Sequence, residues 1–202
     1  MARTPKVVED RREQIIDAAM RVFAQKGFLR ATNKDIADEI SITPGLIYHY
    51  FKNKEAVLKA IIENRSPMRV VRNLPPEAFE QPPTVFLPFL IRQVLSVVED
   101  EQFVQLLHVL VPELVQHPEL TSGVVLALQK VMHVLSTYLE TQMANGELRH
   151  ADAALTVQVL IGSVMGFVLR RQILHDPSAL AYTHEQIVEA VVDTVLQGLL
   201  PR

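Results

Sequence analysis

Apolar residues recur at helical intervals near the start of the chain. Ile15, Ala19, Val22 and Phe23 are separated by four, three and one positions, with polar side chains between them. This spacing places the apolar side chains on one stripe of a helix and the polar ones on the opposite face. Gly27 is predicted to end that helix in a left-handed conformation, which glycine adopts without steric cost.

The same helical spacing continues through the rest of the chain. It occurs in five later segments, which are 85–98, 103–111, 120–143, 153–174 and 187–200. Asn145-Gly146 is predicted to stop one of these helices, and Thr183 with Gln186 has capping-box spacing before the last. No convincing alternation of polar and apolar residues predicts a strand, so the sequence indicates an all-α protein.

The segment after Gly27 predicts two short helices joined by a tight corner. The first follows Thr32, whose hydroxyl can accept a free backbone N–H, and it ends near Ile40. Thr43 is predicted to cap the second helix, and Pro44 occupies its first position, where the missing N–H has no cost. Two short helices behind a longer supporting helix form a helix-turn-helix pattern.

A third helix is predicted to begin at Lys54, after the capping residue Asn53. A small core would then brace the helix that begins at Pro44 and leave its amino end exposed, with free N–H groups that favour phosphate. The predicted core consists of Phe23, Phe28, Ile36, Ala37, Ile40, Ile42, Ile47, Tyr50, Phe51 and Leu58. Spacing alone fits a purely structural three-helix unit equally well. The residues near the exposed end favour nucleic acid, and they are Lys34, Lys52, Lys54, Tyr48 and His49.

Prolines and charge divide the chain. Six of the twelve prolines fall between 67 and 88, where they disfavour a continuous helix. Residues 1–65 carry a net charge of +3 and residues 66–202 a net charge of −6. We therefore expect an N-terminal helix-turn-helix domain over 1–65 and a C-terminal helical domain over 66–202. The basic part hints at a polyanionic partner, although ordinary fluctuation explains so small an excess as well.

Composition narrows the class of protein. The chain has no cysteine, which excludes a disulfide scaffold, a thiolate metal site and a cysteine nucleophile. The first residues contain no apolar stretch typical of a secretory signal. The apolar run 153–169 is shorter than the ~20 residues of a spanning helix, so we expect a buried helix there. A cytoplasmic protein without a membrane partner is the resulting expectation.

Two stretches resemble the DNA-binding region of TetR-family transcriptional regulators. They are Thr32-Asn33-Lys34-Asp35-Ile36-Ala37 and Thr43-Pro44-Gly45-Leu46-Ile47-Tyr48-His49-Tyr50-Phe51-Lys52-Asn53-Lys54-Glu55. The resemblance covers roughly residues 11–58 at the level of motifs. The corner position that is usually glycine in the family is Ser41 here, and a left-handed serine costs ~1 kcal/mol.

The resemblance implies a double-stranded DNA operator and a set of contact residues. Thr32, Lys34, Thr43, Pro44, Gly45, Tyr48, His49 and Lys54 are the implied contacts. Among them, Lys34, Thr43, Pro44 and Gly45 would face the major groove or its edge, and the others would contact phosphates. Because few of these residues carry polar groups that read bases, we expect DNA shape to contribute to specificity.

The C-terminal part predicts a homodimer. The helix around 153–169 is apolar nearly all round, so it needs two buried faces, and the last helix carries a broad apolar seam. Burial inside one chain is the alternative, and the family resemblance implies dimerisation through the last two helices. The expected interface residues are Leu155, Val159, Gly162, Gly166, Val188, Val191, Val192 and Val195. Two reading helices per dimer suit a pseudo-palindromic operator.

The helices from about 84 to 144 resemble the family's effector-binding core in layout. Arg92, His108, His133 and Tyr138 are candidate contacts for a small apolar or amphipathic effector, although each is more often a surface or core residue. Glu113, His117 and His108 could be considered as metal ligands, but four organised ligands are not evident, so neither a metal nor a cofactor is expected.

The sequence therefore indicates a ligand-responsive, sequence-specific transcriptional regulator, a repressor rather than an activator. Two other classes stay open at this point. A small helical enzyme would need a catalytic constellation, and no nucleophile triad, phosphate loop or carboxylate pair is evident. A DNA-architectural or protein-binding module would have a filled core between 84 and 170.

Overall fold

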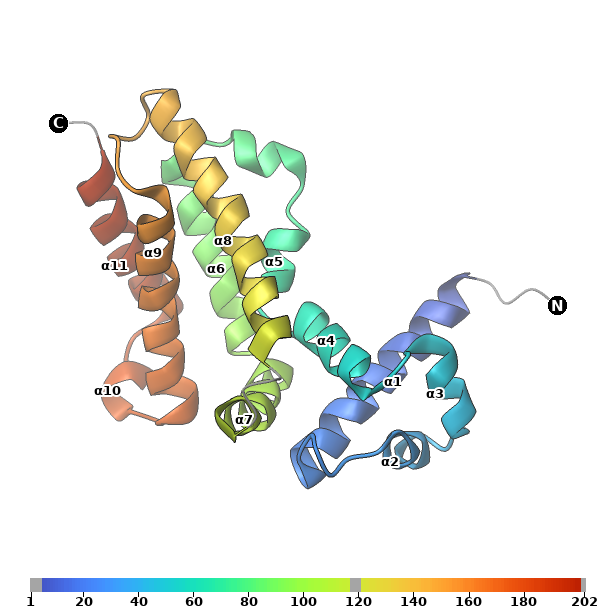
Figure 1. Cartoon of the computed structure of the whole chain (residues 1–202). Coiled ribbons are helices and arrows are strands. Elements are labelled where there is room, and N and C mark those ends of the chain that lie inside the picture. The colour runs from blue at the N-terminus through green and yellow to red at the C-terminus, as the bar shows by residue number, and fades with distance from the viewer. Residues whose placement is uncertain (1–4, 117–120, 201–202) are drawn as a thin grey trace. The chain divides into compact units, whose positions relative to one another are not determined.

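The computed structural model describes residues 5–116 and 121–200 (Figure 1). Every regular element in these ranges is a helix, which confirms the predicted all-α class. The chain divides into two compact units, Met1–Ser66 with Glu101–Val125 and Pro67–Asp100 with Leu126–Arg202. This division concerns packing, and the functional assignment of 1–65 and 66–202 stays a prediction.

The first unit contains five helices in its described part. They are α1 (Pro5–Lys26), α2 (Asn33–Glu39), α3 (Pro44–Tyr50), α4 (Lys54–Arg65) and α7 (Glu101–Gln116). Helix α1 contacts α2, α4 and α7, while α3 contacts α2. The rings of Phe23 and Phe28 meet edge to face in this core, with centroids 5.2 Å apart. Ile40, Ile42 and Tyr50 are only half-buried, unlike the prediction, because they lie at the ends of very short helices.

Two left-handed residues shape the turns of this unit. Gly27 ends α1 with φ 77°, as predicted, and Ser41 occupies the corner between α2 and α3 with φ 54°. The corner is closed by the N–H of Ile42, which donates to the carbonyl of Ala37 at 2.9 Å. Ser41 thus holds a conformation that is strained for a residue with a Cβ.

The predicted caps form at two of the three helix starts. The Thr32 hydroxyl accepts the Asp35 N–H at 3.1 Å, and the Asn53 carboxamide oxygen accepts the Ala56 N–H at 2.9 Å. The prediction for Thr43 was wrong, because its hydroxyl makes no capping hydrogen bond. The N–H of Leu46, which such a cap would satisfy, donates to the Thr43 backbone carbonyl at 2.9 Å, and the Thr43 hydroxyl is left available to other partners.

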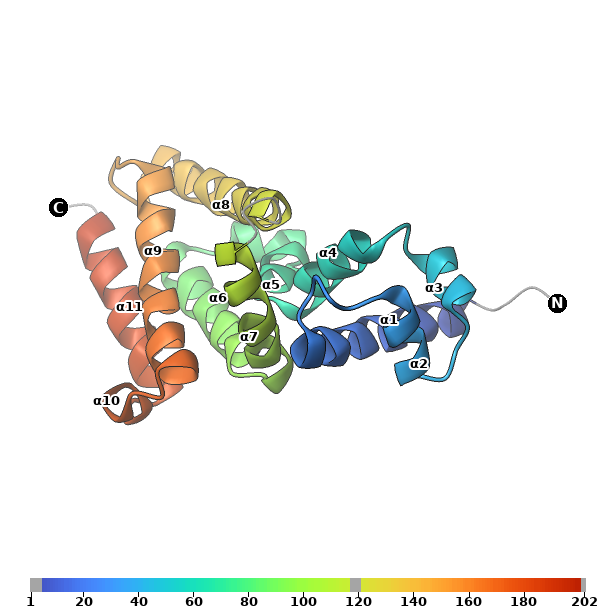
Figure 2. The same cartoon turned by 60° about the horizontal axis from the view of Figure 1, so that its bottom comes forward.

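The second unit contains the remaining elements. They are α5 (Met68–Arg72), the 3₁₀ turn η1 (Pro76–Glu80), α6 (Pro83–Val98), α8 (Thr121–Ala144), α9 (Ala153–Val168), the π-helical turn η3 (Leu169–Ile173), α10 (Pro177–Leu180) and α11 (His184–Leu199). The first residues of α8, up to Val125, belong to the first unit. Helices α9 and α11 run side by side (Figure 1, Figure 2), and α11 also packs against α6.

Helix ends in the second unit follow the predicted signals. Gly146 adopts φ 79° just after α8, and Thr183 with Gln186 forms a complete capping box at the start of α11. The sequence did not predict the short elements α5, η1 and α10, because four or five residues are too few to show a periodic pattern. Pro88 lies inside α6, so this helix begins before the last proline of the stretch 67–88.

Helix α9 buries only one of its faces. Together with η3 it forms an apolar stretch, Ala153–Ile173, long enough to cross a membrane by length and hydropathy alone. Val157, Leu160 and Val164 are buried, whereas Leu155 and Val159 remain 64% and 58% exposed. Within one chain the second unit thus packs against only one side of α9, and burial of the second face against a partner copy stays a prediction.

Replacing Ser41 by glycine is expected to stabilise the first unit. The substitution relieves the left-handed strain and is offset in part by the larger entropy of glycine in the unfolded chain, so the net gain is about 0.5–1 kcal/mol. Urea unfolding of the variant measures this. Ser96→Gly in the exposed interior of α6 is the matched control and should lose a similar amount. A Ser41→Gly protein less stable than the wild type would contradict the strain at this corner.

Candidate nucleic-acid interface

The amino end of α3 is open on the outside. Thr43, Pro44 and Gly45 are all exposed, and a Cβ added to Gly45 would meet no atom within 4 Å. Ile47 is 0% exposed and fixes the opposite side of the helix in the core. Free backbone N–H groups at such an end attract anions, and no side chain of Gly45 blocks a close approach.

The last turn of α3 adds side chains with polar tips. Tyr48 is 61% exposed, and His49 is also exposed, with its ring edge to face against Tyr50 at 5.2 Å between centroids. A phenol and an imidazole N–H both donate hydrogen bonds to phosphate oxygens. The structure therefore brings the predicted contacts of α3 onto one small helix with a buried anchor.

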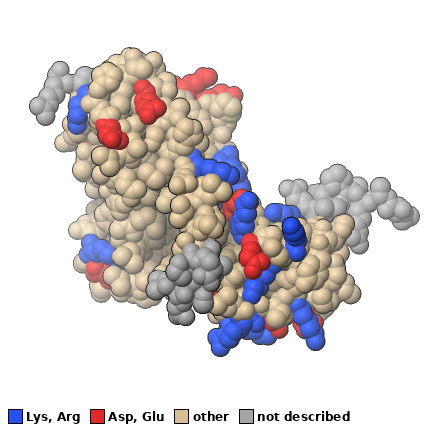
Figure 3. All heavy atoms as spheres, viewed as in Figure 1, with Lys and Arg blue, Asp and Glu red and all other residues tan. Residues whose placement is uncertain are grey.

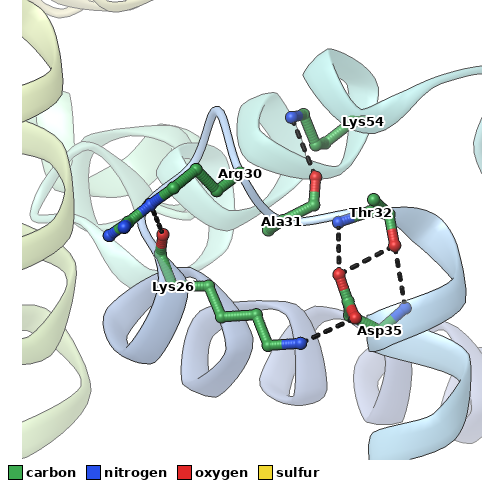
Figure 4. Close-up of polar contacts among 6 residues, drawn as sticks. All are labelled: Lys26, Arg30, Ala31, Thr32, Asp35 and Lys54. Carbon is green, nitrogen blue, oxygen red and sulfur yellow. Dashed lines mark hydrogen bonds and ion pairs between the residues drawn. The ribbon is translucent and has the colours of Figure 1, made fainter.

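A network of hydrogen bonds fixes the start of α2 (Figure 4). The Asp35 carboxylate accepts the backbone N–H and the hydroxyl of Thr32, both at 2.8 Å, in a capping box. The Lys26 ammonium at the end of α1 donates to the same carboxylate at 2.7 Å. Thr32 and Lys34 remain exposed beside this network, so both can reach a ligand outside the unit.

The Asp35 carboxylate is stabilised in its charged form. Its hydrogen bonds with the Lys26 ammonium and with the Thr32 hydroxyl and N–H lower the pKa of Asp35 to about 2. Hydrogen bonds to the ionised form always shift a carboxyl group in this direction. The start of α2 therefore keeps its charged network under neutral and mildly acidic conditions.

Lysine and arginine are more numerous in the first unit than in the second, and Asp and Glu equal them in number there. Figure 3 shows Lys and Arg side chains on this unit with Asp and Glu among them, while the visible face of the second unit carries scattered charged side chains of both signs. Lys34 in the first turn of α2 and Lys52 just after α3 are both exposed. Since lysine and arginine supply the attraction to the phosphate backbone, this distribution agrees with a DNA-binding first unit.

Lys54 differs from the other predicted contacts. Seven of the eight are exposed, whereas Lys54 is half-buried. Its ammonium donates to the backbone carbonyls of Phe28, Leu29 and Ala31 (one of these bonds is drawn in Figure 4). The side chain thus lies against the turn between α1 and α2.

The four candidate effector contacts differ in burial. Arg92 is exposed on α6 and pairs with Glu185 of α11, which raises its pKa, chiefly through that hydrogen bond. His108 on α7 and His133 on α8 are exposed as well. Tyr138 alone is buried, with its hydroxyl donating to the Gln81 carbonyl at 2.9 Å. Burial, and to a smaller extent Glu147, raises the pKa of Tyr138.

The eight candidate interface residues divide by helix. On α9, Leu155, Val159, Gly162 and Gly166 are all exposed and follow one another along a single face. On α11, Val188, Val191, Val192 and Val195 are buried within their own unit. The outward side of α11 instead carries polar and small residues, among them Glu189, Ala190, Asp193 and Thr194.

Glu113 and Arg65 serve the packing of the first unit. The Glu113 carboxylate accepts the backbone N–H of Phe28 at 2.8 Å, and Arg65 of α4 donates to Glu13 and Asp17 of α1, each at 2.7 Å. Sequence reasoning missed both contacts, because their partners lie 48 to 85 positions away and no local pattern marks them. Among the described residues no group of three possible metal ligands occurs, and His117 lies outside them.

The geometry defines a helix-turn-helix DNA-binding protein. The family of bacterial regulatory proteins named after tetR matches residues 15–61, and the C-terminal domain of AefR-like transcriptional repressors matches residues 86–198. The chain belongs to the TetR family of DNA-binding transcriptional regulators.

Curated relatives match a part of this chain. The transcriptional regulator HbdR of Aromatoleum sp. is 43% identical over 60 residues, which are 30% of this chain and 26% of HbdR. TtgR of Pseudomonas putida is 39% identical over 62 residues, 31% of this chain and 30% of TtgR. The chain thus matches less than a third of the length of these relatives.

Solved structures share the whole fold. The SmeT–triclosan complex superposes with a TM-score of 0.75 and 23% identity, covering 94% of this chain and 91% of that one. FadR from Bacillus subtilis in complex with stearoyl-CoA has a TM-score of 0.70 and 22% identity, covering 92% and 98%. At these identities the likeness establishes the fold.

Thr32 and Thr43 allow a matched pair of substitutions. Thr32→Ala removes a formed cap and is expected to cost ~1 kcal/mol of stability, whereas Thr43→Ala removes no cap and should leave the urea midpoint unchanged. Both variants should bind DNA more weakly. Equal losses of stability in the two variants would show that the Thr43 hydroxyl does cap α3 in solution.

Acid should weaken the start of α2 in a defined window. Because the folded pKa of Asp35, about 2, lies below its ordinary value of 3.8, its contribution to stability is complete above pH 3.8 and is lost as the pH falls toward 2. NMR titration of the Asp35 carboxyl and of the Thr32 amide measures this pKa. In an Asp35→Asn protein the Thr32 amide should show no such transition; a titration midpoint near 3.8 in the wild type would refute the network.

Proposed function

We propose that this regulator is a repressor that binds a pseudo-palindromic operator as a homodimer and is released by a small apolar or amphipathic effector. The observation that carries the DNA-binding part is the braced α3 with its exposed amino end. Thr32, Lys34, Thr43, Pro44, Gly45, Tyr48 and His49 are the proposed DNA contacts. Such a protein works in the cytoplasm, where the operator is found.

The exposed apolar face of α9 supports the homodimer. Leu155 and Val159 keep more than half of their surface exposed, next to Gly162 and Gly166, whose lack of side chains permits close approach of a second helix. A continuous apolar face of this kind is costly in water. We propose that α9 of one protomer packs on its partner, and that α11 joins with its small outward residues rather than its buried valines.

The second unit also offers apolar surface for an effector. Along α8 the side chains of Leu126, Leu128, Val131 and Met132 remain at least partly exposed, and burial begins only at Leu135. SmeT, described as the repressor of a multidrug efflux pump of Stenotrophomonas maltophilia, was solved with triclosan, and FadR with stearoyl-CoA. Both ligands fit the apolar or amphipathic class that we propose here.

Segment 101–125 is the proposed route between effector and DNA. It packs with the first unit, where α7 contacts α1 and α4, while the elements on either side of it along the chain, α6 and the rest of α8, belong to the second unit. A ligand that favours one arrangement of the second unit would therefore shift α7 through its connections along the chain. Thermodynamic linkage then requires that DNA weaken effector binding by the same factor.

Operator binding with and without ligand tests the proposal. DNA bound by the protein is first selected from a random library, which also yields the spacing of the half-sites. The affinity for that DNA is then measured with fatty acyl-CoA esters and with halogenated phenols. We expect at least one bound compound to weaken DNA binding. No change with any compound that binds the protein would exclude the switch.

A charge on the exposed face of α9 is expected to break the homodimer. Val159→Glu would bury an unpaired carboxylate on each side of the contact, at roughly 3 kcal/mol or more, and should give a monomer with an unchanged helical spectrum. Val85→Glu on α6, at a valine 51% exposed, is the matched control and should leave the dimer intact. Sedimentation velocity distinguishes these species, and a dimeric Val159→Glu protein would place the interface elsewhere.

A further inference from the structure

Lys54 makes a closed set of contacts at the start of α4. Its ammonium nitrogen lies 2.6 Å from the Phe28 carbonyl oxygen, 3.0 Å from that of Leu29 and 3.0 Å from that of Ala31. An ammonium group has three N–H donors, and here each has a carbonyl partner. The ring of Phe28 also lies under the charge, with its centroid 4.5 Å from the nitrogen. No donor of Lys54 remains for a phosphate oxygen.

The turn that Lys54 contacts has few other ways to satisfy its backbone. Residues 27–31 connect two helices, so most of their carbonyls lack the partners that a helix would supply. Three carbonyl oxygens that converge on one point would repel one another without a cation between them. The positive charge of Lys54 therefore stabilises the shape of this turn directly, at the place where a helix would otherwise use N–H groups.

A carboxylate holds the same turn from the other side. Glu113 of α7 accepts the N–H of Phe28 at 2.8 Å, while Lys54 donates to the carbonyl of the same residue. The φ of 77° at Gly27 favours glycine, and a Cβ there would lie 2.9 Å from the Glu113 Oε1 atom, so that Glu113 would have to move away from the turn. The peptide groups around Phe28 are thus fixed between opposite charges from two helices.

The turn leads straight into the proposed DNA contacts of α2. Ala31, the last carbonyl that Lys54 holds, precedes Thr32, which caps α2 through its box with Asp35. Lys34 follows in the first turn of that helix and is exposed. Displacement of the turn would therefore move Thr32 and Lys34 together, while α3 keeps its own anchor at Ile47.

We propose that Lys54 is a positioning residue for the α2 contacts and does not bind phosphate. It acts through the turn 27–31 and sets where Thr32 and Lys34 meet the DNA. This inference rests on the proposed DNA contacts of α2, and it replaces the phosphate contact that the family resemblance implies for Lys54.

The salt dependence of DNA binding separates the two roles. A residue that neutralises a phosphate contributes ~1 to the slope of log affinity against log salt concentration. Lys54→Met should weaken binding about tenfold with an unchanged slope, whereas Lys34→Met, at an exposed lysine, should lower the slope by ~1. A slope lowered by ~1 in Lys54→Met would overturn the proposal. All affinities are measured well below the unfolding temperature of each variant, on the DNA selected by the wild type.

A double-mutant cycle tests positioning against a merely structural role. If Lys54 acts by placing Lys34, the loss caused by Lys34→Met should be smaller in the Lys54→Met background than in the wild type. Tyr48→Phe, on the independently anchored α3, is the matched control and should cost the same in both backgrounds. Additive effects of Lys54→Met and Lys34→Met would overturn the proposal.

Lys54→Arg keeps the test decisive if Lys54→Met does not fold. A phosphate contact tolerates arginine, but a planar guanidinium cannot direct donors at three carbonyls that converge on one nitrogen. We therefore expect Lys54→Arg to lose affinity although the charge is kept, and to exchange the Ala31 and Thr32 amide protons faster. Wild-type affinity in this variant would overturn the proposal. A wild-type protein that selects no DNA would instead refute the DNA contacts themselves.

Discussion

The packing of two very short helices against α1 is the constraint on which the molecule depends. Helices α2 and α3 have seven residues each, and isolated helices of that length are not stable in water. Each is held by a fully buried isoleucine, Ile36 in α2 and Ile47 in α3. Because one side of each helix is fixed in this way, the amino end of α3 stays exposed in a single orientation. A DNA-binding surface that must match a groove needs such rigidity.

Charged side chains stabilise the parts of the first unit where little apolar surface is buried. The turn between α1 and α2 has too few residues to fold by itself, and four charged side chains surround it, which are Lys54, Glu113, Lys26 and Asp35. Each of these groups meets backbone or a partner charge, so little charge is left unpaired at the turn. Arg65 connects α4 to α1 by the same means. The first unit therefore uses salt bridges and charged hydrogen bonds where its short helices cannot form a larger core.

The second unit is built around a helix with two apolar faces. One face of α9 packs inside the chain, and the other, with Leu155 and Val159, stays exposed. An apolar helix that is satisfied on one side only is incomplete as a monomer, which is why we assign its second face to a partner copy. Segment 101–125 joins this unit to the first along the chain while packing with the first. This connection is the route that we propose between effector and DNA.

The sequence by itself determined the helices and most of their ends. Periodicity, Gly27, Gly146 and the capping boxes act locally, and local signals are what a sequence shows most directly. Seven of the eight residues that it predicts as DNA contacts are exposed in the structure. Only the tertiary structure decided the three carbonyl partners of Lys54, the contact of Glu113 with Phe28 and the inward direction of the α11 valines. These contacts join residues that are far apart along the chain. The spacing of residues in the sequence does not indicate which distant backbone group a given side chain will contact.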